Sequence, residues 1–223
     1  MPTARESLLN AALAALARSP WSAVRMVDVA AAAGLSRQTL YNEFGSKDGL
    51  ARALVRREAD AYLQGLDRLL GERSGPVDPL VAVAEWTVGE AGAKPLLRAL
   101  LTGCWGERLP TPKPVRRGSP PAGAPAQRRA DAGLPAPAEV VELVRDRSLA
   151  ALEQGGRGGD HPRAEDAAAL AHRCELAVRL ALSCVLAPAG GGVGPLVRNV
   201  VGAPSGGRGS ARVSGLSPTV ADR

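Results

Sequence analysis

One short segment of the chain carries polar side chains that can form hydrogen bonds with nucleic-acid bases. It spans residues 36–44, SRQTLYNEF. Leu40 and Phe44 stand four residues apart, so on a helix they share one side and turn inward. The opposite side then carries Arg37, Gln38, Tyr41 and Asn42. Because Arg, Gln and Asn can bond guanine or adenine edges in a major groove, the segment predicts DNA recognition.

The residues before this segment predict a helix and a turn that would position it. Val27, Val29 and Ala30 form the apolar side of a short helix. Gly34 ends that helix, because glycine tolerates the positive φ of many helix exits. Ser36 is a suitable N-cap for the helix that follows. The result is a helix-turn-helix.

Flanking signals predict one helix before this unit and one after it. Thr3 and Glu6 form a capping box at the start of the first helix, which Pro20 ends. Ser46 caps a helix over residues 47–70, long enough to join a head to a separate body. The charge supports DNA binding only weakly. The net charge of +6 lies mostly in the Pro-rich residues 110–130, at +5, whereas residues 1–50 carry +1.

The complete spacing resembles the TetR/AcrR family of bacterial transcriptional regulators. The matching pattern is DVA-x-x-AG-L-S-x-x-TLY-x-x-F-x-S-K-x-x-L, which runs from Asp28 to Leu50. The resemblance covers residues 1 to about 55. It implies an all-α fold, with a helix-turn-helix three-helix DNA-binding domain over residues 1–48 and a helical bundle for ligand binding and dimerisation over 49–201.

The resemblance also implies an activity and its partners. A homodimer would bind a palindromic operator in double-stranded DNA, act as a repressor, and be released by a small-molecule effector. Two alternatives remain open: a ligand-independent DNA-binding module, and a redox sensor that uses cysteines. The predicted location is the bacterial cytoplasm, in association with the nucleoid. Neither a signal peptide nor a membrane span is expected.

The family pattern assigns roles to particular residues of the recognition unit. Arg37, Gln38 and Asn42 would face base edges or nearby backbone, while Tyr41 and Lys47 would reach phosphates. Thr39 would offer its methyl group to thymine or its hydroxyl to phosphate. The predicted DNA contacts are Arg25, Ser36, Arg37, Gln38, Thr39, Tyr41, Asn42 and Lys47.

Arg25 departs from the family pattern, which usually has Thr or Ser there as an N-cap. Arginine cannot cap that helix end, and its charge opposes the helix dipole. Two explanations remain open: Arg25 binds a phosphate, or it is simply exposed.

The later helices predict less about function. One helix is expected from an Asp78 cap and Pro79 to about Gly89, and another over residues 95–106. Their tryptophans, Trp86 and Trp105, either pack in the core or line an effector pocket with Leu101. The lack of a charged cluster there indicates an apolar effector. Two long helices over residues 138–154 and 163–187 would form the dimer interface, with Val144, Ala177 and Ala181. A flexible insert at about 110–137 and a disordered tail over 202–223 complete the prediction.

The sequence offers little support for catalysis. His161 and His172 belong to no HExxH motif, and there is no GxSxG or phosphate-loop pattern. Cys104, Cys174 and Cys184 form no CxxC pair and are expected to be reduced and buried. We therefore expect no enzyme activity, no cofactor and no metal site.

Overall fold

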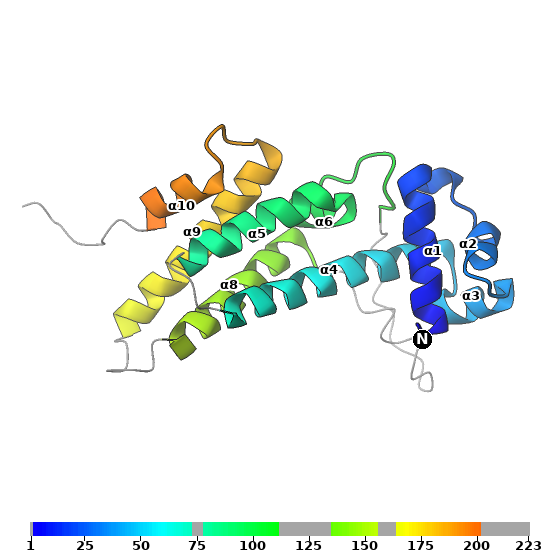
Figure 1. Ribbon diagram of the computed structural model, residues 1–223, viewed down its shortest axis with the longest axis horizontal. Helices are drawn as coiled ribbons and strands as arrows, with labels where there is room; N and C mark the ends of the chain where they lie inside the picture. Colours follow the sequence, from blue (N-terminus) through cyan, green and yellow to red (C-terminus); the bar gives the residue numbers. More distant parts are fainter. Residues whose placement is uncertain (1, 73–77, 112–134, 156–163, 202–223) are drawn as a thin grey trace, which may run out of the picture.

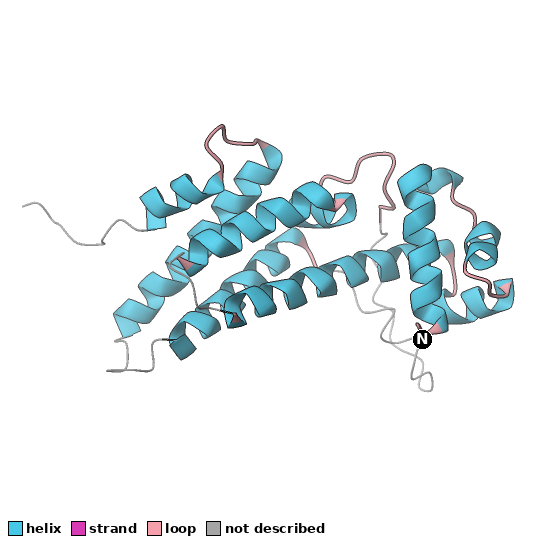
Figure 2. Ribbon diagram, in the orientation of Figure 1, coloured by secondary structure: helices cyan, strands magenta, loops and turns pink. Residues whose placement is uncertain are grey.

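The computed structural model describes residues 2–72, 78–111, 135–155 and 164–201, and all regular structure in these ranges is helical (Figure 2). The predicted all-α class is confirmed. The elements, labelled in Figure 1, are α1 (Ala4–Arg18), the 3₁₀ helix η1 (Trp21–Ala23), α2 (Met26–Ala32), α3 (Arg37–Phe44), α4 (Lys47–Gly71), α5 (Pro79–Ala93), α6 (Pro95–Thr102), α8 (Pro137–Gly155), α9 (Ala164–Leu186) and α10 (Val193–Val201).

Helices α1, α2 and α3 gather at one end of the molecule, and α4 runs from them into a larger bundle (Figure 1). We call residues 2–48 the head and the described residues from 49 onward the body. As predicted, α4 begins at a Ser46 cap, whose Oγ accepts a hydrogen bond from Gly49 N at 3.0 Å. With 25 residues, α4 is about 37 Å long and belongs to both regions.

The head begins with the predicted capping box. Glu6 N donates to Thr3 Oγ1 at 3.2 Å, and Thr3 N donates back to Glu6 Oε2 at 2.7 Å. Leu8, Leu9 and Ala12 of α1 are buried and belong to a cluster that continues along α4. These contacts join α1 to α4, so the head has a fixed orientation at the end of that helix.

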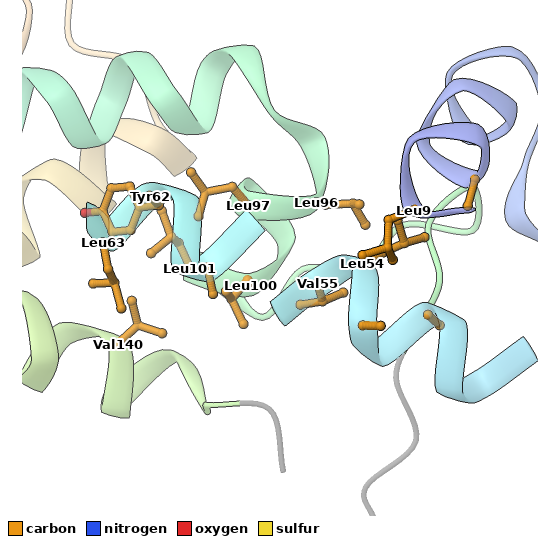
Figure 3. Packing of buried hydrophobic residues seen from close by; sticks show 14 of the residues in the cluster. Leu9, Leu54, Val55, Tyr62, Leu63, Leu96, Leu97, Leu100, Leu101 and Val140 are labelled. Atoms are coloured by element: carbon orange, nitrogen blue, oxygen red, sulfur yellow. The ribbon is translucent and has the colours of Figure 1, made fainter. Parts of the chain in front are cut away.

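The body packs α9 against α5, α8 and α10. Its larger apolar cluster is continuous with the core of the head, and Figure 3 shows Leu9 of α1, Leu54 of α4 and Leu96 of α6 where the two regions meet. A second cluster lies between α5, α9 and α10. Gly65 of α4 lets the ring of Trp86 pack directly against the helix, because a side chain at residue 65 would overlap that ring.

Two predicted helix ends were wrong. α6 ends at Thr102, four residues before the expected Gly106, because Gly103 adopts a left-handed conformation with φ +73°. Trp105 therefore lies in the loop that follows α6. α5 begins with the predicted Asp78 cap and Pro79 but continues past Gly89 to Ala93.

Several sequence predictions fall on other parts of the chain. Residues 112–134 of the expected insert and the expected tail, 202–223, lie outside the described residues. Within the ranges that the structure does describe, none of the helices combines the length and the hydropathy needed to cross a membrane.

Candidate DNA-recognition surface

Local backbone conformation sets the angle between α2 and α3. Gly34 has φ +67°, as the predicted turn requires. Ser36 then caps α3, since its Oγ accepts a hydrogen bond from Thr39 N at 3.0 Å. Leu40 is fully buried and Phe44 is 6% exposed, as predicted. These two side chains fix α3 on the head and determine which side of the helix faces solvent.

One prediction for α2 was wrong. Val29 and Ala30 are buried, but Val27 is 48% exposed. Met26 takes the inward position instead, because residues 26, 29 and 30 follow the i, i+3, i+4 spacing of one helix side, whereas residue 27 lies on a neighbouring side. Val27 is an exposed apolar side chain in the same small head, of the kind that can contact a thymine methyl group.

The outer side of α3 carries the predicted base-reading residues. Arg37, Gln38 and Asn42 are exposed, and Tyr41 is half-buried. Gln38 Nε2 donates to Asn42 Oδ1 at 2.8 Å, so the two amides are already aligned along the helix. Each amide keeps a further donor or acceptor for a base edge. The guanidinium of Arg37 lies 5.2 Å from the centre of the Tyr41 ring, which orients it on this surface.

The hydroxyl groups of Ser36 and Thr39 already have partners. Their oxygens are 2.8 Å apart, and Ser36 Oγ also caps α3. Ser36 therefore has a demonstrated structural role beside its predicted role at DNA. Thr39 keeps its methyl group for a base contact.

Lys47 is held at the junction of η1 and α4. Its Nζ donates to Ser22 O at 3.2 Å and lies 5.3 Å from the centre of the Trp21 ring. Partial burial lowers the pKa of Lys47. An ammonium has three donors, so two remain for a phosphate. Sequence reasoning assigned no role to Trp21 or Ser22, and the only local signal was an aromatic residue directly after Pro20.

Arg25 makes a contact that neither sequence-based explanation included. Its guanidinium donates two hydrogen bonds to Asp28, from Nε at 2.7 Å and from Nη2 at 3.0 Å. This hydrogen bonding raises the pKa of Arg25. Residue 25 provides no side-chain cap, as expected for arginine. Asp28 places a carboxylate in the first turn of α2, where the helix dipole favours it.

Arg5 supports the recognition helix from α1, a role that no sequence pattern predicted. Its Nη1 lies 3.5 Å from a carboxylate oxygen of Glu43 and 3.4 Å from the Glu43 carbonyl oxygen. Its guanidinium also lies 4.7 Å from the centre of the Phe44 ring. The contact joins residues 38 positions apart, so no local pattern could have revealed it.

The predicted ligand-binding residues lie in the body. Leu101 is buried, and Trp86 and Trp105 are partly buried against the same apolar cluster. Trp86 Nε1 is buried and has no hydrogen-bond partner in the described part of the chain. Three of the cavities bounded by described residues can be compared with this prediction, and Trp86, Leu101 and Trp105 line none of these three. Their role in binding a ligand stays a prediction.

The structure corrects the residues chosen for the dimer interface. Val144, Ala177 and Ala181 have no exposed surface within a single chain, so they cannot contact a second copy. Val144 packs in the larger cluster, while the two alanines allow close approach within the bundle. Among large apolar side chains, Leu143 of α8 and Leu186 of α9 are the ones these two helices expose.

The cysteines are free thiols in different environments. Cys174 and Cys184 are buried as predicted, but Cys104 is exposed because it follows the early end of α6. Burial raises the pKa of Cys174 to about 11, which disfavours the reactive thiolate there. The described residues include no group of three or more His, Cys, Asp or Glu side chains placed to hold a metal ion.

The head of this protein is similar in sequence to known DNA-binding regulators. Residues 8–54 match the family model described as "Bacterial regulatory proteins, tetR family". Over 100 residues, 44% of this chain, the protein is 40% identical to the HTH-type transcriptional regulator AlkX of Mycobacterium tuberculosis (strain ATCC 25618 / H37Rv). The matched stretch spans about half of that relative, 47% of its length.

Similar solved structures include the TetR family repressor AlkX from Dietzia sp. strain DQ12-45-1b. It has 23% sequence identity and a TM-score of 0.47, with 88% of this chain and 92% of that chain covered. The fatty acid degradation regulator FadR from Bacillus halodurans has 14% identity and a TM-score of 0.45, with 88% and 95% covered. The family-model match therefore identifies a DNA-binding domain of the TetR type over residues 8–54, and the similarity to a curated HTH-type transcriptional regulator covers 44% of the chain.

Proposed function

We propose that this regulator is a repressor that binds a palindromic operator as a homodimer and is released by a small molecule. The exposed Arg37, Gln38 and Asn42 side chains carry the proposal, because they lie on a short helix fixed by Leu40 and Phe44 beside Lys47. A two-fold dimer would place two such helices in successive major grooves. Residues 1–48 would bind DNA and the body would set their spacing, in the bacterial cytoplasm.

The recognition surface would make two kinds of contact with DNA. Gln38 and Asn42 would read base edges, because their aligned amides offer both donors and acceptors. Lys47 and Tyr41 would bind phosphates and fix the register of the helix without reading sequence. Arg25 would join them only by giving up part of its pairing with Asp28.

Selection of bound sequences from a random DNA library tests the proposal. We expect a palindrome to be enriched, and affinity to fall by roughly 10³ between 50 and 200 mM salt if about six phosphates are contacted. Lys47→Ala should reduce the salt slope by about one per subunit, whereas Gln38→Ala should cost roughly 1–3 kcal/mol at particular base pairs. Arg68→Ala removes an exposed cation from the far end of α4, outside the head and outside α8 and α9, and serves as the control. Enrichment of no palindrome would contradict the proposal.

For the homodimer, we propose the outer faces of α8 and α9 as the contact. Leu143 is 39% exposed and Leu186 is 56% exposed, so each helix offers one large apolar side chain to a partner. Glutamate at both positions should shift the protein from dimer to monomer in sedimentation velocity. Leu196→Glu changes an equally exposed leucine on α10 and should leave the dimer intact. If only Leu196→Glu dissociates it, α10 forms the interface instead.

A further inference from the structure

A cavity of about 630 Å³ lies where the head meets the body. Its walls come from α1, from α4, from the residues that join α5 to α6, and from the loop after α6. Seven of its ten lining residues are apolar: Leu13, Leu16, Ala17, Ala93, Pro95, Leu96 and Leu109. The volume and the apolar lining are those of a small-molecule site.

The loop wall of this cavity is bonded to the head. Arg108 and Leu109 line the cavity, and Arg108 O accepts a hydrogen bond from Trp21 N at 2.9 Å. Figure 1 shows this loop leaving α6 and approaching α1. Trp21 is the residue whose ring lies under the Lys47 ammonium, and Ser22, next to it, accepts the Lys47 hydrogen bond. The cavity wall therefore connects directly to a predicted phosphate contact.

The charges around the cavity determine the kind of ligand that fits. Its lining holds Glu58, Lys94 and Arg108. Lys94 is already paired with Glu90, with Nζ and Oε2 2.6 Å apart. The remaining charges of Glu58 and Arg108 are of opposite sign and cancel. A ligand with net charge would gain little from this balance and would lose hydration on entering an apolar cavity.

We propose that this junction cavity is the effector site and that it takes a neutral, mostly apolar small molecule. The inference rests on the proposed release from DNA. A ligand that displaces Arg108 and Leu109 moves Arg108 O, the atom that accepts the hydrogen bond of Trp21 N. Trp21 and the adjacent Ser22 both contact Lys47, so the position of Lys47 changes with the loop. Only a ligand with different affinity for the two arrangements shifts their populations, so the loop contact is the coupling element.

The test uses the full-length protein and Nile red, a neutral apolar dye whose fluorescence rises in apolar surroundings. We expect one dye per chain, displaced by 1-decanol more readily than by decanoate or decylamine. Ala17→Trp places a large ring in the cavity from an exposed position and should weaken dye binding about tenfold or more. Ala14→Trp adds the same ring to an exposed position of α1 outside the lining and should bind dye like the wild type. If Ala17→Trp binds dye as well as the wild type does, the dye does not bind in the junction cavity and the proposed site is wrong.

Two further measurements separate this inference from the DNA-binding proposal. Addition of 1-decanol should lower operator affinity of the wild type and of Ala14→Trp, but not of Ala17→Trp. Suppose that operator binding is normal and that Trp86→Phe weakens dye binding whereas Ala17→Trp does not. The dye site then lies in the bundle, and the junction-cavity inference fails while the DNA-binding proposal stands. If no operator is found, the dye titration still decides whether the cavity binds neutral apolar molecules. If decanoate or decylamine displaces the dye more readily than 1-decanol does, the proposal of a neutral ligand is wrong.

Discussion

The head and the body differ in what determines their helix ends and faces. In the head, side-chain hydrogen bonds between residues three positions apart set the helix starts: Thr3 with Glu6, Ser36 with Thr39, and Ser46 with Gly49. In the body, contacts between distant residues dominate. Arg98 donates to Val185 O at 3.0 Å, 87 residues away, and the Tyr62 and Thr87 hydroxyls lie 2.8 Å apart across α4 and α5.

This difference follows from what each region has to present. A recognition helix must hold a few side chains at fixed positions, and short-range caps and turns do so with few residues. The body has to bury a large apolar surface, so its helices are placed by packing. The head should therefore be sensitive to small local changes near α3, whereas exposed positions of the body should tolerate them.

The largest expected effect comes from one glycine at the boundary. A side chain at Gly49 would overlap Phe44 O, a backbone atom that cannot rotate away. We expect Gly49→Ala to lower the free energy of unfolding by about 3 kcal/mol and to weaken DNA binding. Measurement requires urea denaturation and a duplex-binding titration of the same samples.

Gly89→Ala is the matched change in the body. Gly89 lies in the middle of α5, and nothing lies within 4 Å of an added Cβ there. Alanine should stabilise this helix by about 0.5–1 kcal/mol and leave DNA binding unchanged. If Gly49→Ala and Gly89→Ala change stability and DNA binding by similar amounts, the head is no more sensitive to local changes than the body.

A smaller effect is expected from the buried hydroxyl pair of the body. Thr87 donates to Val83 O at 2.8 Å, so Tyr62 donates to Thr87. Burial raises the pKa of Tyr62 to about 12, from an ordinary value near 10. Because the folded state favours the protonated phenol, its contribution is complete below pH 10 and is lost as pH rises from 10 to 12.

Wild type should therefore lose about 2 kcal/mol more stability than Tyr62→Phe between pH 9 and pH 12. Urea midpoints at several pH values measure the difference. The phenylalanine variant leaves Thr87 bonded to Val83, so it is the proper reference. Parallel pH profiles would show that Tyr62 ionises without opening the body.

The structure of the head was predicted well because neighbouring residues determine it. The Ser36 cap, the Gly34 turn and the inward Leu40 all depend on residues within a few positions of each other. Val27 was misplaced because Met26 was overlooked as the apolar residue that shares one side of α2 with Val29 and Ala30. Arg5 was missed because its partner Glu43 is distant in the chain.

The body was predicted less well, although its helices were found. α9 is rich in Ala, Leu and Val on several sides, so its sequence does not separate core from interface. Ala177 and Ala181 were therefore assigned to a partner although they are fully buried in the chain. The junction cavity was also not foreseen, because its lining joins residues from 13 to 109.

The smallest expected effect compares one N-cap from each region. Thr3 caps α1 in the head, and Asp78 caps α5 in the body, where its Oδ1 accepts from Leu80 N at 2.8 Å. Replacing either by alanine should cost about 1 kcal/mol, because each removes one capping hydrogen bond. Thermal unfolding with calorimetry measures this cost for both variants.

Their effects on DNA binding should differ. Loss of the Thr3 cap frees the first turn of α1, which contains Arg5, and so loosens the contact of Arg5 with Glu43 and Phe44 at the end of α3. Thr3→Ala should therefore weaken DNA binding about two- to fivefold, on the scale of 1 kcal/mol or less. Asp78→Ala should leave it unchanged, because α5 and the recognition helix are not among the helices that pack closely together in the described chain. If Thr3→Ala and Asp78→Ala weaken DNA binding equally, a local change in the body affects α3. The head and the body would then not be independent of each other.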